Sequence, residues 1–258
     1  MNPWEKGVWC VTILLTAAVL VKLWSSALIK IYKLLFFYLA SDFLSSVVGL
    51  FIPFHSKAYA DYYFSTQTVR IIIAAFMLVE IYSLALERQP ALARFGRSIV
   101  VYILAAAAIL PAIVLLTDRS ASAGAHRYIR GFFLFEQTMD ATIAIFLILI
   151  SIFLTWFPVR MRRNVIVYIT GFIVWSLSRS AMVHVINQWF NNPYLTSATN
   201  IAQMCVALGC LCLWMFGFQR EGEARTAVVG HLWNRAEADR LTEQLDAIND
   251  GLARLRRK

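Results

Sequence analysis

Two carboxylates, Glu136 and Asp140, stand four residues apart in the segment FLFEQTMDATIAIFLILISIFLTWF, residues 133–157. Four residues is close to one helical turn, so both side chains project from the same face of a helix. A carboxylate pair of this kind can form ion pairs with basic side chains, bind a small ligand or ion, or carry protons. Because the segment is otherwise apolar, the helix must place both acids where they are paired or hydrated.

The composition places this helix in a membrane protein. The chain has 258 residues, of which 60% are hydrophobic and 14% aromatic, and its mean hydropathy is +0.64. Too few polar residues remain to cover a soluble globule of this length. The four cysteines lie inside apolar runs without C-x-x-C spacing, so we expect no disulfide framework and no metal site.

Seven apolar runs are long enough to cross about 30 Å of hydrocarbon as helices. They cover approximately residues 8–28, 34–53, 63–86, 98–117, 131–157, 164–187 and 196–218. The sequence therefore predicts an all-α, polytopic fold with a seven-helix transmembrane bundle over residues 1–218. Residues 219–258 are predicted to form a linker and one amphipathic helix.

The basic residues predict the orientation of the bundle. Lysine and arginine collect in the links after the first, third and fifth runs and in the tail, whereas the opposite links are poorer in them, although Arg119, Arg127 and Arg130 reduce the contrast. By the positive-inside rule the N-terminus lies outside and the tail lies in the cytoplasm. The net charge of +9 is then a topology signal and a basic rim facing lipid, and we expect no nucleic-acid partner.

Two cofactors of helical membrane proteins are excluded by single residue types. A retinal Schiff base needs a lysine in the seventh helix, but the chain has no lysine between Lys57 and Lys258. A b-type haem needs two histidines, and His184 is the only one within a predicted span. We therefore expect no cofactor.

Helical rise places six polar residues of different spans at a similar depth, about 6 to 14 Å below the outer boundary. This polar layer consists of Arg70, Glu136, Asp140, Arg179, Asn200 and Gln203. Charges at this depth favour pairing inside the bundle, so Arg70 and Arg179 are expected opposite the two acids. The layer is either a structural clasp between helices or the floor of an outward-open cavity for a small ligand or ion. Near the mouth of such a cavity we expect Tyr62, Tyr63, His184 and Trp189.

Two further acids lie deeper. Asp42, in YLASDFLSS, and Glu80, in FMLVEIYSL, have no cation at matching depth in the predicted spans. Burial then favours the neutral acid, hydrogen-bonded to neighbours such as Ser45, Ser46 or Tyr82. The alternative is a proton or cation path from the polar layer through Asp42 to Glu80.

The tail carries an apolar seam with spacings of three and four residues. Its members are Leu241, Leu245, Ile248, Leu252 and Leu255. About two and a half heptads are too few to be stable alone, so residues 234–258 are expected to pack against a partner. That partner is a second copy of the chain, a cytoplasmic protein, the ends of the chain's own helices, or an anionic lipid surface.

The segments YYFSTQTVR and MLVEIYSLALE and the tail REGEARTAVVGHLWNRAEADRLTEQLDAINDGLARL resemble a family of bacterial seven-helix membrane proteins. The resemblance covers nearly the whole chain and is most specific in the tail. It implies the seven-helix fold and the bacterial inner membrane, and it implies no activity, ligand or catalytic residue.

No motif of a hydrolase, metalloprotease, P-loop or dinucleotide enzyme is present in the sequence. We therefore expect a non-enzymatic, sensor-like or scaffold subunit that couples the bundle to a partner, or to another copy, through the C-terminal helix. The alternative is a small transporter or proton-coupled channel that uses Arg70, Glu136, Asp140 and Arg179. A third interpretation, a lipid-modifying enzyme, would depend on Glu136 and Asp140.

Overall fold

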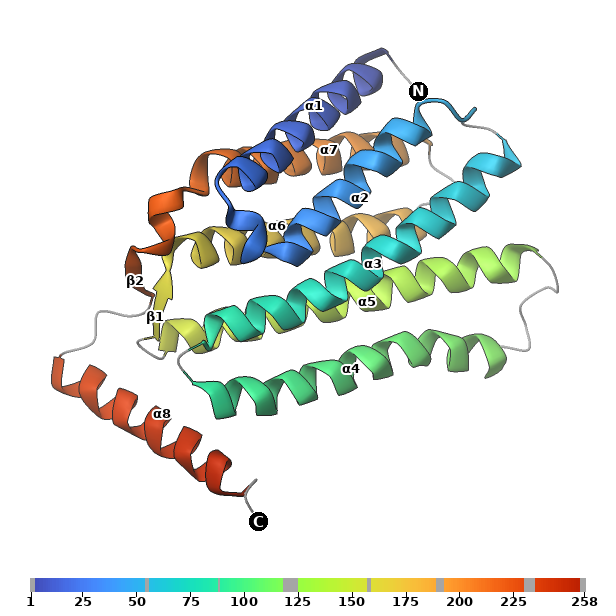
Figure 1. Cartoon of the computed structure of the whole chain (residues 1–258). Helices are drawn as coiled ribbons and strands as arrows, with labels where there is room; N and C mark the ends of the chain where they lie inside the picture. The colour runs from blue at the N-terminus through green and yellow to red at the C-terminus, as the bar shows by residue number, and fades with distance from the viewer. Residues whose placement is uncertain are drawn as a thin grey trace.

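A computed structural model describes residues 3–53, 56–87, 89–117, 125–156, 159–188, 193–229 and 235–255. Over these ranges the protein is all-α, with long helices lying side by side and a further helix across one end of them (Figure 1). The long helices are α1 (Pro3–Ser25), α2 (Lys33–Gly49), α3 (Lys57–Ala85), α4 (Pro90–Thr117), α5 (Ala125–Trp156), α6 (Arg163–Gln188) and α7 (Pro193–Gly217). The short elements are η1 (Leu28–Lys30), β1 (Val159–Arg162), η2 (Arg220–Glu223) and β2 (Thr226–Val229), and α8 (Arg235–Leu255) follows them.

Six of these helices are long and apolar enough to cross a membrane. They are α1, α3, α4, α5, α6 and α7. Large apolar side chains are exposed along the bundle, among them Leu14, Phe37, Phe76 and Phe216, as expected for surfaces that face lipid. The chain thus has the character of a multi-pass helical membrane protein. Helix α2, at the position of the second predicted run, has only 17 residues and is not among the six.

Local chemistry explains how the helices begin and turn. Ser56 is the N-cap of α3, because its hydroxyl accepts a hydrogen bond from the Tyr59 amide at 3.1 Å. Between α1 and α2 the chain reverses through Ala27, whose φ of 56° lies in the left-handed region. This tight elbow returns α2 along α1, and the two helices pack together.

Small residues and aromatic rings let the helices approach closely. Trp214 of α7 lies directly over Gly171 of α6, where an added Cβ would collide with the indole ring. Glycine at such crossings allows close backbone contact between membrane helices. Toward one end of the bundle, the rings of Tyr32 and Tyr168 meet edge to face with centroids 5.5 Å apart, and Phe218 packs on Tyr32. All three side chains are fully buried.

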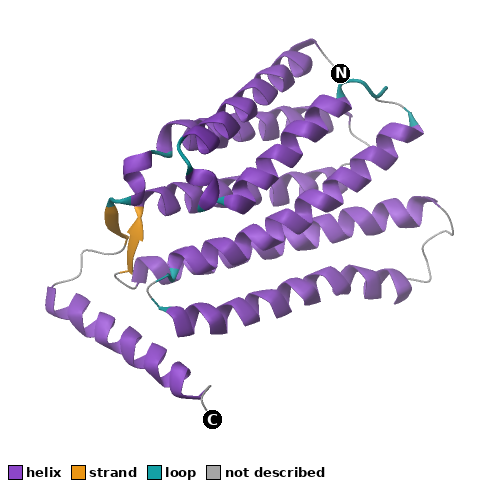
Figure 2. Ribbon diagram, in the orientation of Figure 1, coloured by secondary structure: helices purple, strands orange, loops and turns teal. Residues whose placement is uncertain are grey.

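The only strands in the described ranges tie the tail to this same end of the bundle (Figure 2). Strands β1 and β2 are antiparallel, with Val159 opposite Val229 and Arg162 opposite Thr226. The Arg163 amide also donates to the Arg225 carbonyl at 3.0 Å. We call this end, which carries β1, β2 and α8, the α8 end. The tail therefore contacts the bundle before α8 begins.

Candidate functional site

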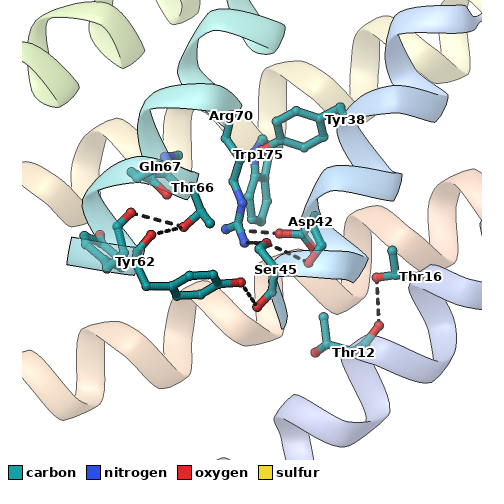
Figure 3. Close-up of polar contacts among 12 residues, drawn as sticks. Thr12, Thr16, Tyr38, Asp42, Ser45, Tyr62, Thr66, Gln67, Arg70 and Trp175 are labelled. Carbon is teal, nitrogen blue, oxygen red and sulfur yellow. Dashed lines mark hydrogen bonds and ion pairs between the residues drawn. The ribbon is translucent and has the colours of Figure 1, made fainter. Parts of the chain in front are cut away.

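Near the middle of the bundle, Arg70 of α3 forms an ion pair with Asp42 of α2, with 3.1 Å between Arg70 Nη1 and Asp42 Oδ1 (Figure 3). The second terminal nitrogen of Arg70 donates to the Ser45 hydroxyl. The expectation that Asp42 lacks a cation was wrong. Arg70 was expected opposite Glu136 and Asp140, but its guanidinium turns toward α2, because the α3 face that carries it packs against α2.

The Asp42–Arg70 pair is held by neighbouring polar groups and is only partly buried. The Tyr62 hydroxyl donates to the Ser45 carbonyl at 2.6 Å, and this bond connects α3 to α2 a second time (Figure 3). About a fifth of each paired side chain is accessible, 20% for Arg70 and 23% for Asp42. A small molecule in an adjoining cavity can therefore reach this pair.

A second cluster joins α3, α5 and α6. Arg179 of α6 donates from Nε to Asp140 at 2.8 Å and from a terminal nitrogen to Glu136. Gln67 of α3 donates to the same Glu136 oxygen at 2.9 Å. The structure thus brings together three members of the predicted polar layer. The expectation that two arginines face Glu136 and Asp140 was wrong, because Arg70 pairs with Asp42 and one guanidinium, that of Arg179, faces both carboxylates.

Two cavities meet at the Asp42–Arg70 pair. The vestibule, of about 220 Å³, is lined by the aromatic residues Trp9, Tyr59, Tyr62 and Tyr63 and by Arg70. The inner cavity, of about 140 Å³, lies between α1, α2, α6 and α7, and Asp42 is part of its wall. Ser46 and Met204 line both cavities. The ion pair therefore stands where one cavity adjoins the other.

The remaining members of the predicted layer lie on α7. Gln203 lines the inner cavity, and its Nε2 is buried without a hydrogen-bond partner among the described residues. Asn200 is half-buried, and no hydrogen bond joins it to the described part of either cluster. Of the residues expected at the mouth of the cavity, Tyr62 and Tyr63 line the vestibule. The His184 Nδ1 atom lies 3.1 Å from Gln137 Nε2. Trp189 lies outside the described residues.

Glu80 lies apart from both cavities, toward the α8 end. Its carboxylate accepts hydrogen bonds from the Leu34 amide at 3.3 Å and from the Tyr168 hydroxyl at 3.1 Å. Serine or tyrosine neighbours such as Ser45, Ser46 or Tyr82 were expected to bond the two deeper acids. The partner of Glu80 is a different tyrosine, Tyr168. Glu80 lines neither the vestibule nor the inner cavity. These two cavities therefore do not extend from Asp42 to Glu80, as the alternative of a proton or cation path would need.

Sequence reasoning missed a polar network at the α8 end, which we call the Arg162 network. Arg162 of β1 bonds both Glu87, at 2.6 and 2.8 Å, and Glu223 of η2, at 3.2 Å. Glu223 also accepts from Tyr32 at 2.7 Å and from Asn164 at 2.6 Å. Burial, reinforced by the bond to Glu223, raises the pKa of the Tyr32 phenol, so Tyr32 stays a donor. The only signal in the sequence was the set of charges flanking the apolar runs.

Helix α8 is docked on the start of α4. The Asn249 side-chain oxygen accepts from the Ala91 and Leu92 amides at 2.9 and 3.3 Å, and Gln89 donates to Asp246 at 2.9 Å. Asn249 thus satisfies amides in the first turn of α4 that lack partners within that helix.

The predicted apolar seam of α8 is only partly covered by the bundle. Leu245 is buried, Leu241 is half-buried and Ile248 is 52% exposed. The side chains of Leu252 and Leu255 lie outside what the structure describes. The chain's own helix α4 contacts α8, as one of the four predicted alternatives has it, and the other three stay predictions.

The charged clusters form ion pairs, and the cavities beside them have room for a small molecule. Among the described residues, no three His, Cys, Asp or Glu side chains gather as a metal site. Comparison with family models, curated proteins and solved structures found no match. The features of the chain that bear on its function are therefore the cavities, the two charged clusters and the docked helix.

Proposed function

We propose that this protein is a non-enzymatic, sensor-like subunit of the bacterial inner membrane. In this proposal a small molecule binds at the Asp42–Arg70 pair, and the bundle passes its effect to the C-terminal helix α8. All seven long helices cross the membrane, the N-terminus lies outside, and α8 lies in the cytoplasm. The distribution of lysine and arginine and the resemblance to the seven-helix bacterial family support this arrangement.

One observation carries the proposal: a single helix, α3, connects the cavities to the docking site of α8. Arg70, in the middle of α3, contacts Asp42. Glu87 and Gln89 follow the end of α3, and they contact Arg162 and the α8 residue Asp246 respectively. From Arg70 to its last residue, Ala85, α3 extends about 22 Å. A ligand that changes the Arg70 contacts can therefore shift the end of α3 and with it the two anchors that follow it.

The output of the sensor is the apolar seam of α8. The contacts of Asp246 with Gln89 and of Asn249 with the first turn of α4 hold α8 in place, so a small displacement of Gln89 or of that turn weakens its docking. Release uncovers Leu245 beside the exposed Ile248. The uncovered seam then binds a cytoplasmic protein or the same seam of a second copy, which is the scaffold role.

Hydrogen exchange measured by mass spectrometry tests this coupling in full-length protein in lipid nanodiscs. Asp42→Asn removes the charge that pairs with Arg70, and we expect amide exchange across residues 237–254 to rise several-fold. The matched control is Leu44→Ala, also on α2, whose side chain is 61% exposed to lipid. Unchanged exchange in α8 of a folded Asp42→Asn protein contradicts the coupling.

The second candidate function is a small transporter or proton-coupled channel. It is favoured by the position of the Asp42–Arg70 pair between two cavities and by a crevice where Arg70 and Arg179 both line the wall. Proteoliposomes with an internal pH dye separate the two candidates. A transporter gives proton flux that Arg70→Gln or Asp140→Asn abolishes, whereas a sensor gives no flux above that of empty liposomes.

A further inference from the structure

The inner cavity is elongated along α7. Six of its lining residues come from one face of that helix: Gln203, Met204, Ala207, Cys210, Leu211 and Trp214. Gln203 and Trp214 are eleven residues apart, which is three helical turns and about 16 Å. Helix α2 contributes part of the wall and runs antiparallel to α7 (Figure 1), so the order Ser46, Asp42, Leu39 on α2 and the order Gln203, Ala207, Leu211 on α7 both lead toward the α8 end.

The two ends of this cavity differ in polarity. Gln203, Ser46 and Asp42 supply polar groups at the end that adjoins the vestibule. Beyond them Ala207 and Leu211 are apolar, and Trp214 at the far end turns its Nε1, which is also without a hydrogen-bond partner among the described residues, against Gly171 of α6. A ligand that fits both ends must itself be polar at one end and apolar at the other.

The polar end has a donor without an acceptor. The buried Nε2 of Gln203 has no hydrogen-bond partner among the described residues, and a buried donor without a partner is unfavourable. Asp42 is already neutralised by Arg70, so this end presents no uncompensated charge to an ion. The missing partner is thus a neutral oxygen acceptor, such as a hydroxyl or a carbonyl.

We propose that the inner cavity binds a small neutral amphiphile, with an apolar body of about six carbon atoms and a hydroxyl or carbonyl oxygen at one end. The size follows from the volume, since an apolar cavity of about 150 Å³ holds a molecule as large as benzene. The oxygen accepts from Gln203 beside Ser46, and the carbon chain lies along Ala207 and Leu211. The ligand enters through the vestibule, with which the cavity shares Ser46 and Met204.

This inference rests on the proposed function in taking the cavity as the sensor's binding site, and binding can be measured without any assay of sensing. Fluorine NMR of full-length protein in detergent micelles follows two probes, 6,6,6-trifluorohexan-1-ol and 1,1,1-trifluorohexane. They differ in the oxygen alone. We expect saturable binding of the alcohol at least tenfold tighter than that of the alkane.

Three variants locate the binding. Gln203→Met removes the donor while keeping the size of the side chain, and we expect the preference for the alcohol to fall below threefold. Ala207→Phe fills the cavity and should abolish saturable binding of both probes. Cys212→Phe places the same bulk on an exposed position of α7 outside the cavity lining, and binding should be unchanged.

The proposal is overturned if wild-type protein shows no saturable binding, if it binds both probes equally, or if Ala207→Phe binds the alcohol as wild type does. The probe comparison on wild-type protein decides the matter even where a variant does not fold. Failure here is distinct from failure of the sensing role. If the alcohol binds as expected but leaves hydrogen exchange in α8 unchanged, the site stands and the sensing role fails. If neither probe binds while Asp42→Asn still loosens α8, sensing stands and this ligand class fails.

Discussion

The charge of Arg179 is important for the stability of the bundle, because it compensates two buried carboxylates. The side chains of Glu136 and Asp140 are only 1% and 6% exposed, and no other cation contacts them among the described residues. Removing one partner of a buried ion pair costs about 3 to 5 kcal/mol, because the remaining charge is left without compensation. We expect Arg179→Gln to lower the Tm of the detergent-purified protein markedly.

The control for this prediction is Arg97→Gln, which removes the same charge from an exposed position of α4. The triple variant Arg179→Gln, Glu136→Gln, Asp140→Asn leaves no unpaired charge and should regain most of the lost Tm. If the Tm of Arg179→Gln equals that of the Arg97→Gln control, the ion pairs of Arg179 contribute nothing to stability.

Depth along a helix can be predicted from sequence, whereas the direction of a side chain around the helix is harder to predict. Helical rise grouped Glu136, Asp140 and Arg179, and the structure brings these three together. Depth alone did not locate the partner of Arg70, because the α3 face that carries Arg70 packs against α2, where Asp42 lies. Gln67, three residues before Arg70 on α3, shares its face and could have been included on that ground.

At the scale of single elements, α8 depends on Asn249 for its position on α4. The side-chain oxygen of Asn249 accepts from two amides in the first turn of α4. An N-cap side chain accepts in the same way from the first turn of its own helix. Loss of such a cap costs about 1 kcal/mol. We expect Asn249→Ala to raise hydrogen exchange across α8 about fivefold, and the neighbouring exposed Asp250→Ala to leave it unchanged. Equal protection in both variants means that Asn249 is not needed to hold α8, because Leu245 and the bond from Gln89 to Asp246 suffice.

The packing of α3 on α4 depends on Gly96. The Tyr82 hydroxyl and ring lie over Gly96 so closely that an added Cβ would overlap them. We expect Gly96→Ala to displace Tyr82, separate the two helices locally and lower the Tm by several degrees. Gly209→Ala on α7 is the matched control, since a Cβ there meets no atom within 4 Å. A Gly96→Ala protein as stable as this control shows that Tyr82 rotates away freely.

The Arg162 network shows which element contacts a sequence does not reveal. Arg162 and Glu223 are 61 residues apart, and both lie outside the long helices in short segments without apolar periodicity. The pairing of β1 with β2 brings them together, but four-residue strands carry too little pattern to be predicted. The apolar seam of α8 was predictable because it repeats over the length of a helix.

For the molecule as a whole, the run lengths of apolar residues predicted the all-α fold and the membrane character. The fold is confirmed, and six long apolar helices support the membrane character. Run length is a local property that the sequence states directly. The number of crossings is less direct, because it depends on α2. Its 17 residues extend about 25 Å as a helix, at the lower limit of what crosses a bilayer core.

The parity of the crossings decides this question. Seven crossings place the two termini on opposite sides of the membrane, whereas six place them on the same side. In Figure 1 the N-terminal end of α1 and the helix α8 lie at opposite ends of the bundle, which favours seven crossings. We expect protease added to intact spheroplasts to remove an N-terminal epitope tag and to spare a C-terminal tag until the membrane is permeabilised. If the protease removes both tags or spares both tags in intact spheroplasts, α2 does not cross the membrane. The second predicted run then lies within the bundle without reaching both faces.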